Sequence, residues 1–179
     1  MADNTPRNTL WIIIILILIL GAFLWAYPKL FNQPIVSNNE SNNNQADSNE
    51  QNNELAQVKS VVENFGQQIK NVSLLNPNAS QLIDQYYKDY VSQDLLNQWK
   101  ANPANALGRQ TSSPWPDRID VTNVQRTAND TYTVEGNIIE VTSQEQANGG
   151  AAATRPATFT VKNIEGRWLI TQISTASYQ

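Results

Sequence analysis

The chain has 179 residues, a formal net charge of −4, and neither cysteine nor histidine. Without these two residue types it cannot form a disulfide, use a thiolate or an imidazole in catalysis, or offer the commonest transition-metal ligands. Its acids and bases form no clustered basic face, so the sequence predicts no nucleic-acid partner. It also predicts no metal and no cofactor.

An uncharged apolar run lies between Arg7 and Lys29 and contains LWIIIILILILGAFLWAY. At about 1.5 Å per residue it reaches about 31 Å as a helix, which spans the hydrocarbon core of a bilayer. A cleaved signal peptide and a buried core helix are the alternatives, but FLWAYPKLF lacks the small residues of a cleavage site. We therefore predict a transmembrane helix over residues 9–28 in contact with the lipid bilayer.

The orientation of this helix follows from its flanks. Positive charge is nearly balanced between the two sides, with Arg7 before the span and Lys29 after it. Because so little chain precedes the span, we predict a short cytoplasmic tail over residues 1–8 and an extracytoplasmic C-terminal domain. This describes a single-pass protein of the cell membrane, and the cysteine-free exterior suits a bacterial envelope.

A polar segment follows the predicted span. Residues 37–54 read SNNESNNNQADSNEQNNE, with Ala46 as their only apolar side chain. Such a segment cannot bury enough surface to offset the entropy cost of ordering it. We predict a flexible, disordered, Asn-rich linker over residues 29–54, followed by a folded domain over residues 55–179.

The folded domain opens with apolar residues at helical spacing: Leu55, Val58, Val62, Phe65, Ile69 and Val72. This spacing predicts one helix of about 18 residues with a single apolar stripe. The stripe either packs onto a sheet or forms a short coiled-coil seam for self-association, although it is shorter than coiled coils usually require.

Two shorter helices are predicted next. The turn NPNAS ends the first helix, and the second runs from about Ser80 to Tyr90 with a tyrosine-rich face. Ser92 is a suitable N-cap for a third helix, QDLLNQWK.

After Lys100 the apolar period changes from helical to alternating, which predicts strands. They cover about residues 119–124, 132–139, 157–161 and 167–174, with a bulge at Ile138–Ile139 and a loose loop over residues 144–154. Helices followed by hairpin-linked strands predict an α+β fold. In it, about three helices pack on one face of a curved antiparallel sheet of about four strands.

Two segments carry a resemblance to a known family. The tyrosine-rich helix leads into YVSQDLLNQW, and the chain closes with the hairpin sequence IEGRWLIT. Over residues 55–175 the chain resembles the nuclear transport factor 2-like superfamily, whose cystatin-like cone packs helices into a curved sheet. The resemblance implies a cone-shaped domain and, as in singly anchored members, a bacterial envelope protein; it assigns no functional residue.

Four aromatic residues are candidate contacts of a ligand or partner: Tyr86, Tyr90, Trp99 and Trp115. Tyr86 and Tyr90 are predicted to share a helix face, where their rings either pack on the sheet or meet a ligand. Trp99 lies on the apolar face of the third helix. Trp115 lies in SSPWPDR, where two prolines impose extended geometry, and it either plugs the end of the core or anchors a partner.

The sequence places no pair of charged side chains where both could act on one substrate atom. An isomerase of this fold class needs a carboxylate base and a tyrosine donor. Glu135 and Glu140 lie an odd number of positions apart on one strand, so they face opposite sides unless the bulge realigns them. Asp117 and Arg118 are adjacent and are also predicted to point apart. We therefore assign no catalytic residue.

These observations favour a membrane-anchored extracytoplasmic protein whose cone domain acts in protein–protein interaction or self-assembly, not in catalysis. The tether concentrates the domain at the membrane, which strengthens weak contacts. The alternative is a module that binds a small ligand at the mouth of the cone, and an isomerase-type enzyme ranks last.

Overall fold

The computed structural model of the protein describes residues 40–178, with side chains from residue 49 onward. The predicted tail over residues 1–8, the predicted transmembrane helix over residues 9–28 and the start of the predicted linker lie outside these residues. Within the described part of the chain, no helix combines the length and the apolar character that a membrane crossing requires. The whole core described below lies within Ala46–Gln179.

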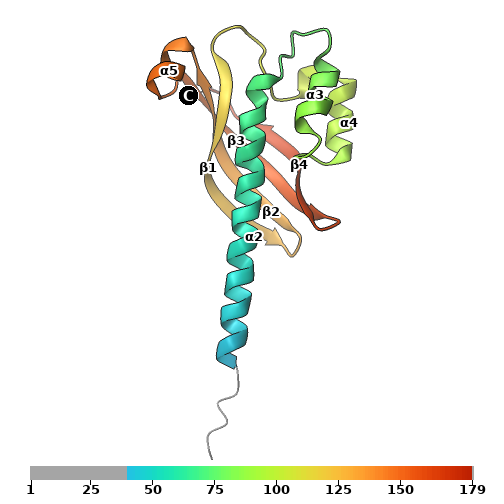
Figure 1. Ribbon diagram of the computed structural model, residues 1–179, viewed down its shortest axis with the longest axis vertical. Helices are drawn as coiled ribbons and strands as arrows, with labels where there is room; N and C mark the ends of the chain where they lie inside the picture. Colours follow the sequence, from blue (N-terminus) through green and yellow to red (C-terminus); the bar gives the residue numbers. More distant parts are fainter. Residues whose placement is uncertain (1–39, 179) are drawn as a thin grey trace, which may run out of the picture. The chain divides into compact units, whose positions relative to one another are not determined.

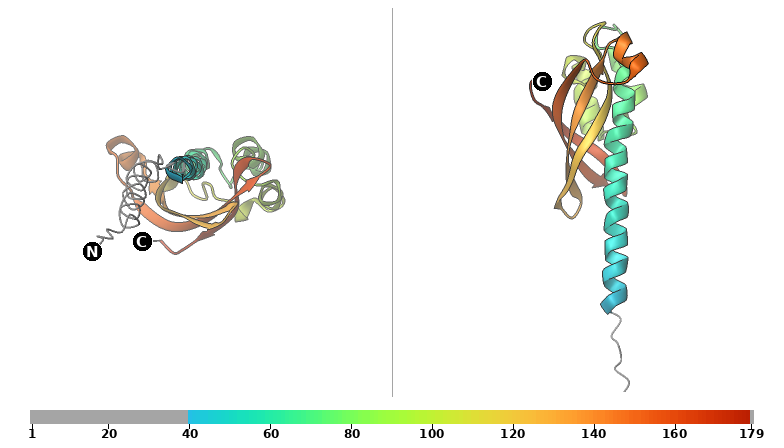
Figure 2. Two further views of the ribbon diagram at one scale, coloured as in Figure 1. Left: turned by 90° about the horizontal axis from the view of Figure 1, so that it is seen from below. Right: turned by 90° about the vertical axis from the view of Figure 1, so that its left-hand side faces the viewer.

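The described residues form helices and a four-stranded sheet (Figure 1). In chain order the elements are α2 (Glu40–Gln68), η1 (Ile69–Asn71), α3 (Ala79–Tyr87), α4 (Gln93–Ala101), η2 (Pro103–Asn105), β1 (Trp115–Ala128), β2 (Thr131–Val141), α5 (Ser143–Asn148), β3 (Ala153–Ile164) and β4 (Arg167–Thr175). The strands lie in the order β1-β2-β3-β4, and all neighbours are antiparallel. The sheet curves around the side that carries α2, α3 and α4 (Figure 2), which confirms the predicted α+β fold.

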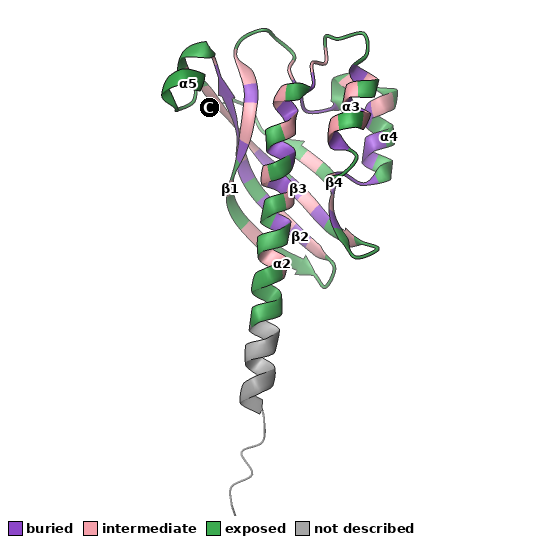
Figure 3. Ribbon diagram, in the orientation of Figure 1, coloured by how far each residue is buried: buried purple, intermediate pink, exposed green. Residues whose placement is uncertain are grey.

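The apolar stripe of α2 and η1 packs onto the sheet. Five of the predicted stripe residues are fully buried: Val58, Val62, Phe65, Ile69 and Val72. Burial along one side of α2 is visible in Figure 3. Gly66 allows the helix to approach β1, because a Cβ atom there would lie 2.6 Å from the backbone nitrogen of Ile119. The stripe is thus buried within the chain's own core and is not exposed as a coiled-coil seam.

Helix α2 begins well before its predicted start at Leu55. It already includes Glu40, so residues 40–54 of the predicted flexible linker are helical. Extending an existing helix costs far less than nucleating one, and the C-terminal half of α2 is already stabilised by its packing on the sheet. The junction is also held to the sheet, because Glu54 Oε2 accepts a hydrogen bond from the Tyr132 hydroxyl at 3.0 Å and lies 3.4 Å from Arg126 Nη1. Composition alone could not reveal these tertiary contacts.

The shorter helices agree with the prediction in part. Ser92 caps α4 as predicted, and its Oγ accepts a hydrogen bond from the Leu95 backbone nitrogen at 3.4 Å. The predicted loop over residues 144–154 instead begins with the helix α5. This helix has a capping box, in which Thr142 Oγ1 accepts from the Gln144 backbone nitrogen and the Glu145 carboxylate accepts from the Thr142 backbone nitrogen.

The β-bulges lie in β1, not in β2. The register of β1 and β2 shifts between Pro116 and Arg118, between Val121 and Asn123 and between Arg126 and Ala128, whereas β2 pairs with β3 without a shift. The bulge predicted at Ile138–Ile139 is therefore wrong, and both residues are buried on opposite faces of the strand. The first of these bulges also brings Asp117 to Arg118, with 3.4 Å between Oδ2 and Nη1, so the prediction that they point apart is wrong as well.

Aromatic rings fill the space between the helices and the sheet. The ring centroid of Phe65 lies 4.9 Å from that of Tyr87 and 6.1 Å from that of Trp99. A second pair, Tyr132 and Trp168, meets edge to face at 5.2 Å. These distances are those of favourable aromatic contacts, so the interior is packed with side chains at the level of these rings.

Candidate functional site

Trp99, one of the four predicted contact residues, belongs to the core. It is 5% exposed, and its ring centroid lies 5.8 Å from that of Tyr87. Its side chain therefore holds α4 against the rest of the domain and does not face a ligand at the surface. An apolar face at helical spacing is the signal of such a core position.

The three neighbouring tyrosines occupy different environments. Tyr87 is fully buried, and its hydroxyl donates to the carbonyl oxygen of Leu107 at 2.6 Å. This burial raises the pKa of the Tyr87 phenol, which therefore stays protonated. Tyr86 and Tyr90 are only half-buried, and Tyr90 lies beyond the end of α3. The sequence did not distinguish Tyr87 from its neighbours.

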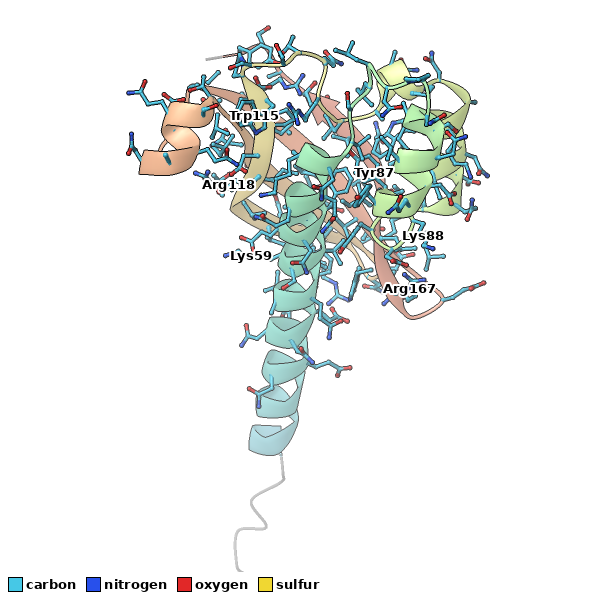
Figure 4. All side chains as sticks on the ribbon, turned by 45° about the horizontal axis from the view of Figure 1, so that its top comes forward. Lys59, Tyr87, Lys88, Trp115, Arg118 and Arg167 are labelled. Carbon is cyan, nitrogen blue, oxygen red and sulfur yellow. The ribbon has the colours of Figure 1, made fainter. Side chains whose placement is uncertain are left out.

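Trp115 lies at the start of β1 and is half-buried. The Arg109 guanidinium lies 5.3 Å from the centroid of its ring, a distance suited to a cation–π contact. The preceding turn is closed by Thr111 Oγ1, which donates to the carbonyl of Pro114 at 2.7 Å, and the Ser113–Pro114 peptide bond is cis. Figure 4 shows Trp115 far from Arg167, at the other end of the sheet. Trp115 and Tyr90 therefore do not form one site.

A surface groove of about 450 Å³ includes Tyr90 and separates α2 from the hairpin of β3 and β4. One wall is a single side of α2, and the other is made by the turn after α3 together with the hairpin. The lining residues are Ala56, Gln57, Ser60, Val61, Asn64, Asp89, Tyr90, Gly166, Arg167 and Trp168. Ala56 and Ser60 are one helical turn apart, and their small side chains leave the space that the groove occupies.

The turn after α3 is fixed to the sheet by backbone hydrogen bonds. The Tyr90 carbonyl accepts from the Ile170 nitrogen, and the Ser92 nitrogen donates to the Ile170 carbonyl, both at 2.9 Å. These bonds bracket an isolated parallel bridge between Val91 and Ile170. Tyr90 is therefore held in a defined place beside the groove, although it belongs to neither a helix nor a strand.

The floor and the rim of the groove differ in chemistry. Val61 and Tyr90 are half-buried and Trp168 is 7% exposed, so they offer apolar surface at the bottom. At the rim, Arg167 Nη2 lies 4.0 Å from Asp89 Oδ1, and the two side chains are 61% and 70% exposed. An ion pair this exposed contributes little to stability, so both charges can exchange to a partner at little cost.

The lining carries no arrangement suited to catalysis. Its charged members are Asp89 and Arg167, which form the exposed pair just described. General acid–base chemistry needs a donor and an acceptor directed at one reacting atom. Elsewhere, Glu135 is exposed and Glu140 is buried on the other face of β2, so these two carboxylates do not converge. Among the described residues, no group of three or more acidic side chains is placed to hold a metal ion.

Neither a family model nor a curated protein matches the chain. Among solved structures, the chain is similar to a protein from Shewanella oneidensis MR-1 that is described as an NTF-2 like protein of unknown function. The two are 16% identical, and the similarity covers 55% of this chain and 84% of that chain with a TM-score of 0.30. A similarity this weak does not establish a family. The α+β fold rests on the helices and strands themselves, and membership of the nuclear transport factor 2-like superfamily stays a prediction.

Most residues of the groove were not predicted from the sequence, although the sequence contains one signal for them. Val61 lies next to the stripe residue Val62 and is apolar without belonging to the stripe. Such an apolar residue at the border of a helical stripe indicates a second, weaker contact surface. Asp89 and Arg167 gave no signal, because their meeting depends on the tertiary fold.

Proposed function

We propose that the chain is a single-span membrane protein whose C-terminal domain, in the bacterial envelope, binds a protein partner through this groove and catalyses no reaction. The observation that carries the proposal is an apolar floor that remains open at the surface of a domain whose interior is filled. Val61, Tyr90 and Trp168 can receive an apolar side chain, and the polar rim can orient the backbone that carries it.

The exposure of the groove favours a protein partner over a small ligand. Apart from Val61, Tyr90 and Trp168, every lining residue is exposed. Small-ligand sites bury most of the ligand surface, and a small molecule in this groove would keep much of its surface in water. A protein partner covers the rim as well, which excludes water from the contacts at the floor.

Site-specific photo-crosslinking tests the groove directly. A photoreactive amino acid replaces Asn64, which is exposed and lines the groove, or Gln125, which is exposed on β1 and does not. In membranes that contain the full chain, we expect one adduct of discrete mass from position 64 and none from position 125. Adducts of the same mass from both positions, or no adduct from position 64, would contradict the proposal.

A second variant tests the same groove by filling it. Ser60→Arg places a long side chain in the groove at an exposed position of α2, and Asn52→Arg places the same side chain on an exposed position outside it. Only Ser60→Arg is expected to abolish the adduct formed from position 64. Native mass spectrometry of the full chain distinguishes the alternative, because a reproducible bound small molecule without any adduct would favour a ligand-binding module.

The absence of cysteine makes the membrane topology easy to test. An Asn52→Cys variant carries a single thiol at an exposed position. In intact cells that express the full chain, a membrane-impermeant maleimide should label this variant and leave the cysteine-free parent unlabelled. Labelling only after lysis would place the domain in the cytoplasm. Release of the parent chain from membranes by alkaline carbonate would argue against the anchor over residues 9–28.

A further inference from the structure

On the inner face of the sheet, the rows of apolar side chains end at two charged residues, Glu140 and Arg155. In the register of β2 and β3, Arg155 lies directly opposite Ile138, so both side chains point to the same face. Glu140 follows Ile138 by two positions on β2 and shares that face. A carboxylate and a guanidinium therefore lie on the same face of neighbouring strands, in diagonal positions where the apolar core ends.

Arg155 is only partly satisfied by the protein, and the nearby Glu140 is buried. Glu140 is 6% exposed. The Nε atom of Arg155 is buried and has no hydrogen-bond partner among the described residues. A buried polar atom without a partner costs free energy, and such atoms are rare in folded proteins. An unpaired guanidinium nitrogen near a buried carboxylate leaves a donor to which a ligand's acceptor can bind.

Tyr178 covers both residues. Its hydroxyl donates to Glu140 Oε1 at 2.9 Å, and the centroid of its ring lies 5.1 Å from the Cζ atom of Arg155. The site thus makes a hydrogen bond to a phenol and stacks the ring of that phenol on a cation. Desolvation and the hydrogen bond to Glu140 raise the pKa of the Tyr178 phenol, which keeps the donor protonated at neutral pH.

A ligand could displace the Tyr178 side chain from Glu140 and Arg155. Tyr178 is 56% exposed. Beyond the end of β4, the segment that carries it is paired to β3 by a hydrogen bond from the Ala176 nitrogen to the Pro156 carbonyl at 2.9 Å. Few interactions must break for this segment to move, and its departure would uncover Glu140 and Arg155.

We propose that Glu140 and Arg155 form a binding site for a phenolic ring that carries an anionic acceptor, and that Tyr178 occupies this site in the absence of the ligand. The phenol hydroxyl donates to Glu140, and the ring stacks on Arg155 as the ring of Tyr178 does. The anionic group pairs with the guanidinium, whose Nε atom Tyr178 leaves without a partner. The site is separate from the groove and does not depend on the function proposed for it.

Isothermal titration of the full chain in detergent with the meta and para isomers of hydroxybenzoate tests the proposal. Benzoate, which lacks the hydroxyl, is the control ligand. Tyr178→Ala should bind at least one hydroxybenzoate about tenfold more tightly than the parent, because the competing side chain is gone. Tyr178→Ala should also prefer that hydroxybenzoate to benzoate. Equal binding of hydroxybenzoate and benzoate by Tyr178→Ala, or no binding of either, would overturn the proposal.

A matched pair of variants tests the carboxylate. Glu140→Gln and Glu135→Gln make the same change on the same strand, but Glu135 is exposed on the other face. In the Tyr178→Ala background, Glu140→Gln should weaken hydroxybenzoate binding by about tenfold or more, since it removes a charged hydrogen-bond acceptor. Glu135→Gln should leave binding unchanged, and an equal loss in both variants would refute the assignment.

A third ligand identifies the source of the phenol. N-acetyl-tyrosinamide presents the same ring without a carboxylate, as the tyrosine of another protein would. If Tyr178→Ala binds hydroxybenzoate more tightly than this amide, the ligand is a small aromatic acid, as proposed. If the amide binds more tightly, the anionic part of the proposal is overturned and the site accepts a tyrosine side chain from a partner.

Should Glu140→Gln fail to fold, the comparison of Tyr178→Ala with Tyr178→Phe still tests the site. Phe keeps the ring but loses the hydrogen bond to Glu140, so Tyr178→Phe should gain less affinity than Tyr178→Ala.

Discussion

The hydroxyl of Tyr87 offers a sharp test of the packing between α3 and the segment after α4. It is fully buried and donates to the Leu107 carbonyl at 2.6 Å. Tyr87→Phe keeps the ring and its contacts but leaves this buried carbonyl without its donor. Loss of a buried partner costs about 1–3 kcal/mol. With a urea m-value of about 2 kcal/mol/M, the midpoint of unfolding should fall by about 0.5–1.5 M.

The matched control is one residue away. Tyr86 is half-buried, and its hydroxyl has no hydrogen-bond partner within residues 49–178. Tyr86→Phe should therefore change the free energy of unfolding by less than about 0.5 kcal/mol. Urea titrations of residues 46–179, which contain the whole described core, measure both changes by tryptophan fluorescence. Equal midpoints for the two variants would refute the assignment of the buried hydrogen bond.

The effect of Tyr87→Phe on stability should depend on pH in the alkaline range. Burial raises the pKa of Tyr87 above its ordinary value of 10.0. A group whose pKa is raised by folding contributes stability below its unfolded pKa and loses that contribution as the pH rises above it. The stability difference between the parent and Tyr87→Phe should therefore shrink above about pH 10. A difference that stays constant through this range would show that Tyr87 ionises as easily in the folded protein as in the unfolded chain.

Two further predictions concern the helix–sheet contact and acid stability. Gly66→Ala should destabilise the domain by about 1–3 kcal/mol despite the better helix propensity of alanine, because the new Cβ atom would meet the Ile119 backbone nitrogen at 2.6 Å. The exposed neighbour Gln67→Ala is the control in urea titrations, and an equal effect would contradict the close approach. A hydrogen bond from Lys100 lowers the pKa of Asp84, so this carboxylate stabilises the fold above its unfolded pKa and loses that effect as the pH falls through its folded pKa. Asp84→Asn should therefore lower the urea midpoint at about pH 7 and leave it unchanged at about pH 2; a loss of equal size at both pH values would exclude this role.

The parts of the fold that depend on local pattern could be predicted from the sequence. The stripe that includes Val58 and Phe65 predicted a buried helix face, and Ser92 predicted the start of α4. Alternation of apolar residues predicted an antiparallel sheet. Each of these signals lies within a few residues along the chain, so no knowledge of distant contacts was needed.

The features that depend on distant contacts were missed. The start of α2 depends on packing and on the meeting of Glu54 with Arg126, and these residues are far apart in the sequence. The bulges in β1 depend on its register with β2, which a run of apolar residues does not specify. The separation of Tyr87 from Tyr86 depends on a carbonyl at Leu107 that only the fold brings near.

The hydrogen bonds that fix the turn after α3 also bear on the solubility of the domain. β4 lies at an edge of the sheet, and an edge strand offers unpaired backbone groups on which a second chain can add a strand and aggregate. Ile170 uses its outward N–H and C=O on Tyr90 and Ser92, so this part of the edge is already paired within the chain. Tyr90, which lines the groove, thus also prevents a second chain from adding a strand at this part of the edge. A variant that displaces Tyr90 should accordingly aggregate more readily, even where the rest of the core remains folded.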